Sequence, residues 1–232
     1  MSDPVAADFD RFAQLTGPAD EDDLYHPFLL GLVPPAVGHA LDLGCGTGGF
    51  TRLLAPRAAG VTAVDFSPEM LRVAAERSAH LPGIEWVQAD ANTYAIEPES
   101  YDLIVSLKTL HHLHADEVVP RLAGALRPGG LLLLHDVLDS DGGLAGAFRD
   151  VLASVVRAGH RLARSGRLRE RRELREFWTA HARHDQHPTF AAARALAQTW
   201  LPGSRVYRHL MWRYTVVFRK DPLRRSAAAG SS

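Results

Sequence analysis

The 232-residue chain is poor in three features that would each point to a particular class of protein. It has one cysteine, so no disulfide forms within the chain and a reducing compartment is expected. Its 26 basic and 27 acidic residues leave a formal charge of −1, so no overall field attracts a polyanion such as nucleic acid. No apolar run approaches the roughly 20 residues of a membrane-spanning helix, and the first residues lack the pattern of a signal peptide. We therefore expect a cytoplasmic protein with no nucleic-acid or membrane partner.

Apolar residues, in contrast, are plentiful. They make up 46% of the chain, which is enough to bury a sizeable core, and the length fits one α/β domain with an elaboration. Between residues 38 and 137, short apolar runs alternate with helical patterns, which is typical of stacked βαβ units. The expected parallel strands are 39–43, 61–65, 84–89, 103–106 and 131–135, and the expected crossover helices lie near 49–57, 68–79 and 116–126.

The pattern changes after the fifth expected strand. Apolar residues recur on one helical face between residues 144 and 162, and the chain then becomes rich in arginine, which predicts a helical insertion packed over the sheet. Another helix is expected at 190–200. The β-rich segments at 206–207 and 214–218 leave no room for a crossover helix, which predicts an antiparallel pair at the sheet edge.

A glycine-rich loop follows the first expected strand. Gly44, Gly46 and Gly48 allow a tight turn and the close approach of a ligand, and the amides at the start of the next helix can face a carboxylate or phosphate. Gly44, Gly46 and Gly49 also satisfy the dinucleotide fingerprint, and Asp65 ends the second strand where an acid would hold a ribose. The loop alone therefore leaves a nicotinamide enzyme open.

Three further features disfavour a dinucleotide. Asp42 stands two residues before the first glycine, where a carboxylate suits the ammonium group of a bound amino acid and repels a pyrophosphate. Asp90 ends the third strand, where it can accept a hydrogen bond from an adenine amino group. The terminal strand pair also departs from an all-parallel dinucleotide domain.

Over about residues 24 to 220 the chain resembles the class I S-adenosylmethionine (SAM) dependent methyltransferases of the small-molecule type. Five motifs carry the resemblance in order: LDLGCGTG, VTAVDFSPEML, QAD, YDLIVSLKTLHHL and LRPGGLLLLHDV. It implies an α/β fold with a Rossmann-like, mostly parallel sheet of seven strands, a C-terminal antiparallel hairpin and a helical lid insertion. It also implies SAM as cofactor and S-adenosyl-L-homocysteine (SAH) as product. The expected units are an N-terminal helical cover (1–37), the SAM-binding core (38–137), the lid (138–188), the last helix and strand pair of the core (189–220) and a disordered tail (221–232).

The resemblance also implies contacts to SAM by motif position. Gly44, Gly46 and Gly48 would line the methionine moiety with Asp42 near its ammonium group, Asp65 would accept both ribose hydroxyls, Phe66 and Met70 would pack on the adenine, Asp90 would accept from its amino group, and the backbone of Ser106 and Leu107 would complete a pocket that also includes Cys45 and Ala91. For each acid, the alternative is an ordinary helix cap or turn residue.

Histidines are the candidate bases. Methyl transfer from a sulfonium is an in-line displacement, and much of its acceleration comes from holding the nucleophile near the methyl group in a desolvated pocket. A base is needed only when the acceptor arrives protonated. The candidates are His111 and His112 after the fourth strand, His26 in the N-terminal segment, and His135 at the end of the fifth strand. A structural role for the His111-His112 pair is the alternative.

Some chemistries are disfavoured. The fourth-strand exit, residues 106–109, lacks the Asn/Asp-Pro-Pro-aromatic run of nucleic-acid amino methyltransferases and has no carboxylate for magnesium. His181 and His184 share a helical face, but without further ligands no metal is expected. Lys108 could contact an acidic substrate or reach solvent. The Arg-rich segment 157–175 could bind an anion or form a solvated, salt-bridged helix.

We therefore expect metal-independent methyl transfer to O, N or C of a small metabolite, with oxygen marginally favoured, by a monomer or homodimer. Two alternatives remain. One is an NAD-dependent oxidoreductase, and the other is a catalytically inactive SAM-binding regulator or partner subunit.

Overall fold

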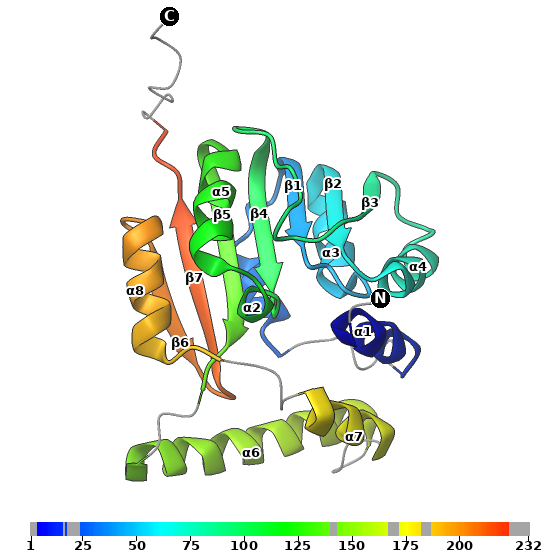
Figure 1. Cartoon of the computed structure of the whole chain (residues 1–232), viewed down its shortest axis with the longest axis vertical. Coiled ribbons are helices and arrows are strands. Elements are labelled where there is room, and N and C mark those ends of the chain that lie inside the picture. The colour runs from blue at the N-terminus through cyan, green and yellow to red at the C-terminus, as the bar shows by residue number, and fades with distance from the viewer. Residues whose placement is uncertain are drawn as a thin grey trace, which may run out of the picture.

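The computed structural model describes residues 4–15, 17, 24–139, 143–166, 172–181 and 187–222. In this part of the chain, seven strands form one sheet in the order β3-β2-β1-β4-β5-β7-β6 (Figure 1). The strands are β1 (Val37–Leu43), β2 (Ala58–Asp65), β3 (Ile84–Gln88), β4 (Tyr101–Leu107), β5 (Leu126–Val137), β6 (Arg205–His209) and β7 (Arg213–Arg219). The first five are parallel, and β7 is antiparallel to both β5 and β6. The predicted seven-stranded sheet with its terminal antiparallel pair is confirmed.

The central strands are apolar on both faces because helices cover both faces. On one face, residues such as Leu132 and Ile104 pack under α5 (Ala115–Ala125) and α8 (Phe190–Trp200). On the other face, residues such as Leu133 and Val105 pack under α2 (His26–Leu32) and α3 (Gly49–Leu54). Adjacent residues of one strand therefore serve different cores, which gives the continuous hydrophobic runs of the sequence.

The crossover helices begin where the sequence predicts them. Before α4 (Pro68–Arg77), the Ser67 hydroxyl accepts a hydrogen bond from the Met70 amide at 3.0 Å, and Pro68 occupies the first turn. The helix expected over 49–57 is instead α3 followed by the 3-10 turn η2 (Ala55–Arg57), because Pro56 has no amide hydrogen to continue the α-helical ladder. None of the described helices combines the length and apolarity that crossing a membrane requires.

The strand order reverses between β1 and β4. In open α/β sheets, ligands bind at the carboxyl ends of the strands on either side of such a switch point. Three helices lie beyond that edge of the sheet: α1 (Pro4–Leu15), α6 (Gly143–Ser165) and α7 (Arg172–His181) (Figure 1). The aromatic ring of Phe12 in α1 stacks on Phe177 in α7 with centroids 5.0 Å apart. The N-terminal segment therefore covers the edge where a ligand is expected.

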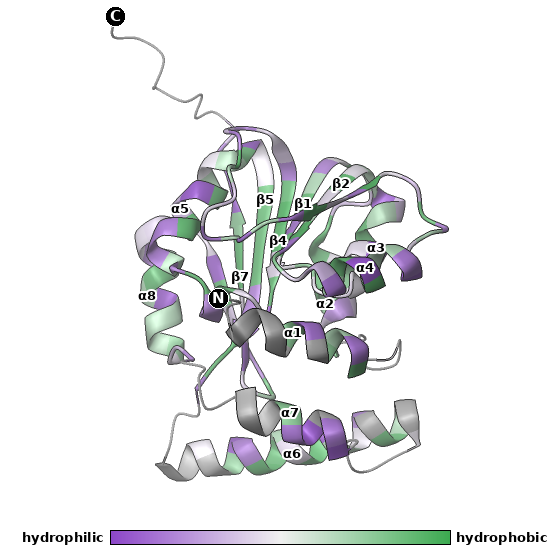
Figure 2. Cartoon of the chain, turned by 45° about the vertical axis from the view of Figure 1, so that its right-hand side comes forward, coloured by the Kyte–Doolittle hydropathy of each residue, from purple (hydrophilic) through white to green (hydrophobic). Residues whose placement is uncertain are grey.

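Helix α6 does not pack its apolar face over the sheet, in contrast to the prediction. Phe148 and Val151 are 71% and 64% exposed, whereas Ala153 on the opposite side of the helix is buried. That opposite side is held by Asp150, whose carboxylate accepts a 2.7 Å hydrogen bond from the Trp212 indole of the β6–β7 turn. In Figure 2, α6 lies along the bottom of the molecule, away from the sheet. The division of the chain into five units stays a prediction, and residues 223–232 of the expected tail lie outside the described residues.

Candidate functional site

A cavity of about 420 Å³ lies at the carboxyl ends of β1 to β4. Its walls come from the glycine loop, the residues that end β2 and β3, the turn after β4, and helices α1 and α2. The first four of the five motifs, which are separate in the sequence, therefore meet in one cavity.

The glycine loop has the left-handed backbone that its composition predicts. Gly44, Gly46 and Gly48 have φ values of +77°, +53° and +76°. A Cβ atom on Gly44 would lie 2.2 Å from the Thr109 hydroxyl, so only glycine fits where this loop meets the turn after β4. Gly44 and Gly46 line the cavity, as does Cys45, whereas Gly48 lies behind the loop and faces the Trp86 ring. Gly48, unlike its neighbours in the loop, is not a lining residue of the cavity, and its expected contact with the methionine moiety stays a prediction.

Asp65 ties the end of β2 to this loop. Its carboxylate accepts a 2.8 Å hydrogen bond from the Gly46 amide and a 3.0 Å hydrogen bond from the Ser67 amide. Burial raises the pKa of Asp65, although these amides act in the opposite direction. The side chain also lines the cavity, where its carboxylate can meet ribose hydroxyls.

Asp42 is the most deeply buried acid of the cavity wall, with only 2% of the residue exposed. The Thr51 hydroxyl donates to it at 2.6 Å. Burial raises the pKa of Asp42 to about 7, and the nearby charge of Asp65 acts in the same direction. A cationic ligand group would reverse this effect.

Asp90 sits at the exposed rim of the cavity. Its Oδ1 atom accepts a 2.8 Å hydrogen bond from the Asn92 amide, which forms the local turn that the alternative interpretation foresaw. Ala91 and Asn92 line the cavity beside it. Asp90 therefore shapes the turn after β3 and also faces the cavity.

Aromatic residues of α1 complete the apolar wall. Phe66 and Met70 line the cavity as predicted from their motif positions. Phe9 contacts the Phe66 ring edge-on at 5.4 Å, and Phe12 packs against the buried cluster that contains Met70. Sequence reasoning missed Phe9 and Phe12, although their three-residue spacing before the first strand was a signal for a helical apolar face.

Ser106 does not line the cavity. Its residue is 1% exposed and its hydroxyl has no hydrogen-bond partner in the part of the chain that the structure describes. The neighbouring Leu107, Lys108 and Thr109 line the cavity instead. Of the two residues that were expected to complete the pocket, Leu107 lines the cavity and Ser106 does not.

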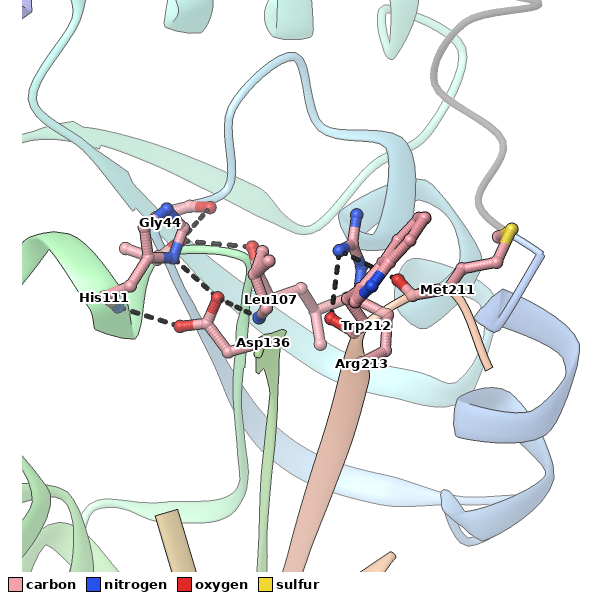
Figure 3. Close-up of polar contacts among 9 residues, drawn as sticks. Gly44, Leu107, His111, Asp136, Met211, Trp212 and Arg213 are labelled. Carbon is pink, nitrogen blue, oxygen red and sulfur yellow. Dashed lines mark hydrogen bonds and ion pairs between the residues drawn. The ribbon is translucent and has the colours of Figure 1, made fainter. Parts of the chain in front are cut away.

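The candidate histidines separate into two groups. His26 and His112 line the cavity. His111 does not: its Nδ1 atom lies 2.6 Å from Asp136 Oδ1, and its amide donates to Asp136 Oδ2 at 2.8 Å (Figure 3). His135 points to the other core, where it lies 2.9 Å from the Thr215 hydroxyl.

The buried pair of His111 and Asp136 supports His112. Burial alone would raise the pKa of Asp136, but the hydrogen bond and charge of His111 outweigh it and hold that pKa below its ordinary value. The His111 ring lies against the His112 ring with centroids 3.9 Å apart. Asp136 therefore fixes His111, and the His111 ring packs against the His112 ring.

The metal and anion candidates near the lid lie partly outside the described residues. Among the described residues, no cluster of three or more His, Cys, Asp or Glu side chains could hold a metal ion. His184, one of the two histidines considered for a metal, lies outside the described residues, as do residues 167–171 of the Arg-rich segment. In the described part of that segment, Arg172 forms an exposed 2.7 Å ion pair with Glu176.

Comparison with known proteins points to methyltransferases. Residues 40–130 match the family model described as a methyltransferase domain. A trans-aconitate 2-methyltransferase of Paracidovorax citrulli (strain AAC00-1) is 43% identical over 122 residues, which cover 50% of this chain and 46% of the relative. An uncharacterized methyltransferase of Mycobacterium tuberculosis (strain ATCC 25618 / H37Rv) is 34% identical over 155 residues, which cover 66% of this chain and 58% of the relative. The chain thus spans about half the length of the curated relatives it matches.

Solved structures agree on the fold. The N-methyltransferase NodS from Bradyrhizobium japonicum WM9, in complex with SAH, superposes with a TM-score of 0.62 at 18% identity and covers 94% of this chain and 99% of its own. Phosphoethanolamine N-methyltransferase 1 of Haemonchus contortus gives a TM-score of 0.59 at 17% identity, over 100% of this chain and 52% of its own. Since the family match, the relatives and the fold agree with the ordered motifs, residues 40–130 form a methyltransferase domain of the class I SAM-dependent type, whose cofactor is SAM.

Proposed function

We propose that this protein transfers the methyl group of SAM to a small-molecule acceptor, with an oxygen atom as the favoured methyl acceptor. The observation that carries the proposal is one cavity lined both by acids at the ends of β1, β2 and β3 and by histidines from α2 and from the turn after β4. A volume of about 420 Å³ falls within the range of small-molecule sites. Two of the curated relatives are named trans-aconitate 2-methyltransferase, and these names favour a small acceptor with oxygen nucleophiles.

The residues that line the cavity suggest a partner for each part of SAM. Asp42, at the bottom of the cavity, would face the ammonium group. Asp65 would accept from the ribose hydroxyls, and Asp90, at the rim, would accept from the adenine amino group. Phe66 and Met70 would pack on the adenine ring.

The histidines of the cavity support the transfer step. Bound SAM supplies an electrophilic methyl group, and its S–CH₃ bond breaks as the acceptor atom bonds to carbon, with the electron pair remaining on sulfur. His112 lines the cavity from the turn after β4 and would take the proton of an acceptor that arrives protonated. His26 lines the cavity with it, and the aromatic residues of α1 exclude water from the same space. His111 holds His112 in place and does not reach the acceptor.

The test is binding followed by transfer. Calorimetry with SAM, SAH and NAD establishes the cofactor: SAM and SAH should bind, and NAD should give no heat. Methyl-labelled SAM is then incubated with a panel of small carboxylic acids, phenols and amines, including trans-aconitate, and labelled products are identified by mass spectrometry. Tight NAD binding would overturn the cofactor assignment. SAM binding without any labelled product would favour the catalytically inactive regulator or partner subunit.

Other aspects of the proposal concern where and in what form the protein acts. The lone Cys45 sits in the cofactor loop, and burial raises the pKa of its thiol, which keeps it protonated. This favours the reducing cytoplasm as its location. The proposed working form is a monomer or a homodimer without a nucleic-acid partner.

A further inference from the structure

We propose that Lys108 forms an oxyanion-binding subsite, so that the acceptor carries a carboxylate or phosphate group in addition to its reacting atom. This inference rests on the proposed function, because it concerns the acceptor half of the same cavity.

The charged and titratable side chains of the cavity come from different elements. All acids among the described residues that line it, Asp42, Asp65 and Asp90, stand at the ends of β1, β2 and β3. The lining residues from the turn after β4 and from α2 include Lys108, His112 and His26 and no acid. A cationic amino-acid end of SAM fits the acids, and an anionic ligand fits the lysine and histidines.

The backbone of Lys108 is unusual for a lysine. Its φ is +58°, a left-handed conformation that glycine and asparagine adopt at lower cost. Such conformations in bulky residues gather at functional sites, where the side chain is needed despite the strain. Lysine is also rare in this chain: only Lys108 and Lys220 occur among its 26 basic residues, and the rest are arginines. Both facts favour a specific role for the ammonium group over general solvation.

The turn that carries Lys108 is fixed in place beside the cofactor loop. The Lys108 amide donates a 2.7 Å hydrogen bond to the carbonyl of His135 in β5. The neighbouring Thr109 hydroxyl lies 3.3 Å from the Gly44 carbonyl and 3.1 Å from the Leu107 carbonyl. Thr109 also fills the space that a side chain on Gly44 would need. Lys108 is therefore held next to the loop that is proposed to hold the methionine moiety, where the methyl group is delivered.

The two lysines allow a direct measurement. Reductive methylation with ¹³C-formaldehyde keeps the lysine charge and labels only Lys108, Lys220 and the amino terminus. Lys220 is the internal control because it is anchored far from the cavity, with its Nζ atom 2.6 Å from the Leu126 carbonyl. The signals are assigned with Lys108→Arg and Lys220→Arg. The SAH complex is then titrated at physiological salt with succinate, citrate, inorganic phosphate and the neutral analogue succinamide.

The proposal expects the Lys108 signal to shift with at least one of the oxyanions, the Lys220 signal to stay, and succinamide to give no change. The preferred anion separates a carboxylate subsite from a phosphate subsite. By calorimetry, Lys108→Gln and Lys108→Asn should lower the affinity for that anion at least tenfold. In Lys108→Arg and Lys220→Gln, the affinity should stay within about threefold of the wild-type value. Asparagine suits the left-handed backbone, so Lys108→Asn guards against loss of folding.

Three outcomes would overturn the proposal: no shift at Lys108, equal shifts at both lysines, or unchanged anion affinity in both uncharged variants. Chloride competing as well as the carboxylates do would also count against a built subsite. SAH affinity separates this inference from the proposed function. If SAH fails to bind the wild type, the proposed function fails first. If SAH binds equally to the wild type and to Lys108→Asn, but no anion shifts the Lys108 signal, only the subsite is refuted.

Discussion

Cofactor binding is expected to strengthen as pH rises toward neutrality, because of Asp42. Burial raises the pKa of this carboxyl group to about 7 in the ligand-free protein. If Asp42 faces the ammonium group of SAM or SAH, only the ionised carboxylate gives the attraction, so binding must release the proton that the free protein holds. The α-amino group of the ligand loses its proton only above neutral pH, so it stays charged throughout this range.

The expected magnitude follows from this pKa. With a value of about 7, Asp42 is about 3% ionised near pH 5.5 and about half ionised near pH 7. The apparent Kd of SAH should therefore fall about fifteen-fold between these conditions. Close to one proton should be released per ligand bound at the lower pH and about half a proton at the higher pH.

The same pKa predicts the stability of the ligand-free protein. The folded-state pKa is raised above the ordinary value of 3.8, so between these two values the folded protein keeps a proton that the unfolded chain has lost. The free energy of unfolding contributed by Asp42 therefore falls as pH rises through this window, by up to about 4 kcal/mol for the full shift.

Calorimetry in buffers of different ionisation enthalpy measures both Kd and proton release, and chemical denaturation measures stability. The control is Asp42→Asn, which keeps a hydrogen-bond acceptor for Thr51 and cannot ionise. It should bind SAH more weakly near neutral pH and lose the pH dependence of both binding and stability. The reasoning is refuted if the wild-type Kd changes less than about threefold over the window, or if Asp42→Asn keeps the wild-type slope.

Two further predictions test other residues of the site, and a third tests the attachment of α6. Asp65→Ala removes two hydrogen bonds to the ribose, each of about 1.5 to 3 kcal/mol at most, so calorimetry should show SAM binding weakened at least tenfold; an unchanged Kd in the folded variant would remove Asp65 from the site. His112→Gln should lower kcat by about 10² to 10⁴ with SAM affinity intact, and a loss under about threefold would mean that proximity and desolvation carry the reaction. Trp212→Phe removes the hydrogen bond to Asp150 in α6, so it should lower the free energy of unfolding by about 1 kcal/mol and speed protease cleavage within 143–165. SAH binding should stay unchanged. If the variant is cleaved at the wild-type rate, this bond does not hold α6.

The core of the fold was predictable because its determinants are local. A parallel strand covered on both faces must be apolar along its whole length, which gives runs such as Leu131 to Leu134. A loop that turns tightly against a neighbour must contain glycine, as the contact between Gly44 and Thr109 requires. Both features can be recognised in short stretches of sequence.

Features that depend on distant contacts were not predictable in the same way. Strand β5 begins at Leu126, several residues before the expected start, and the Gly129 amide donates to the Lys220 carbonyl of the segment after β7. The two histidines of one motif lie in different surroundings: Asp136, 25 residues later, is bonded to His111, whereas His112 lines the cavity. The exposed face of α6 depends on Trp212 in the hairpin turn. Each of these outcomes needs a partner that periodicity cannot identify.

Asp42 and Lys108 share one property: each destabilises the ligand-free protein. Asp42 costs stability at neutral pH because its carboxylate is buried, and Lys108 costs stability because its backbone is left-handed. A ligand of opposite charge offsets the first cost directly and gives a reason to retain the second residue despite its strain. Replacing either residue by asparagine, which needs no charge and accepts the left-handed conformation, should therefore stabilise the ligand-free protein and weaken binding of the opposite charge. Residues that only maintained the fold would give the reverse result on stability, so paired measurements of unfolding and binding distinguish the two roles at each position.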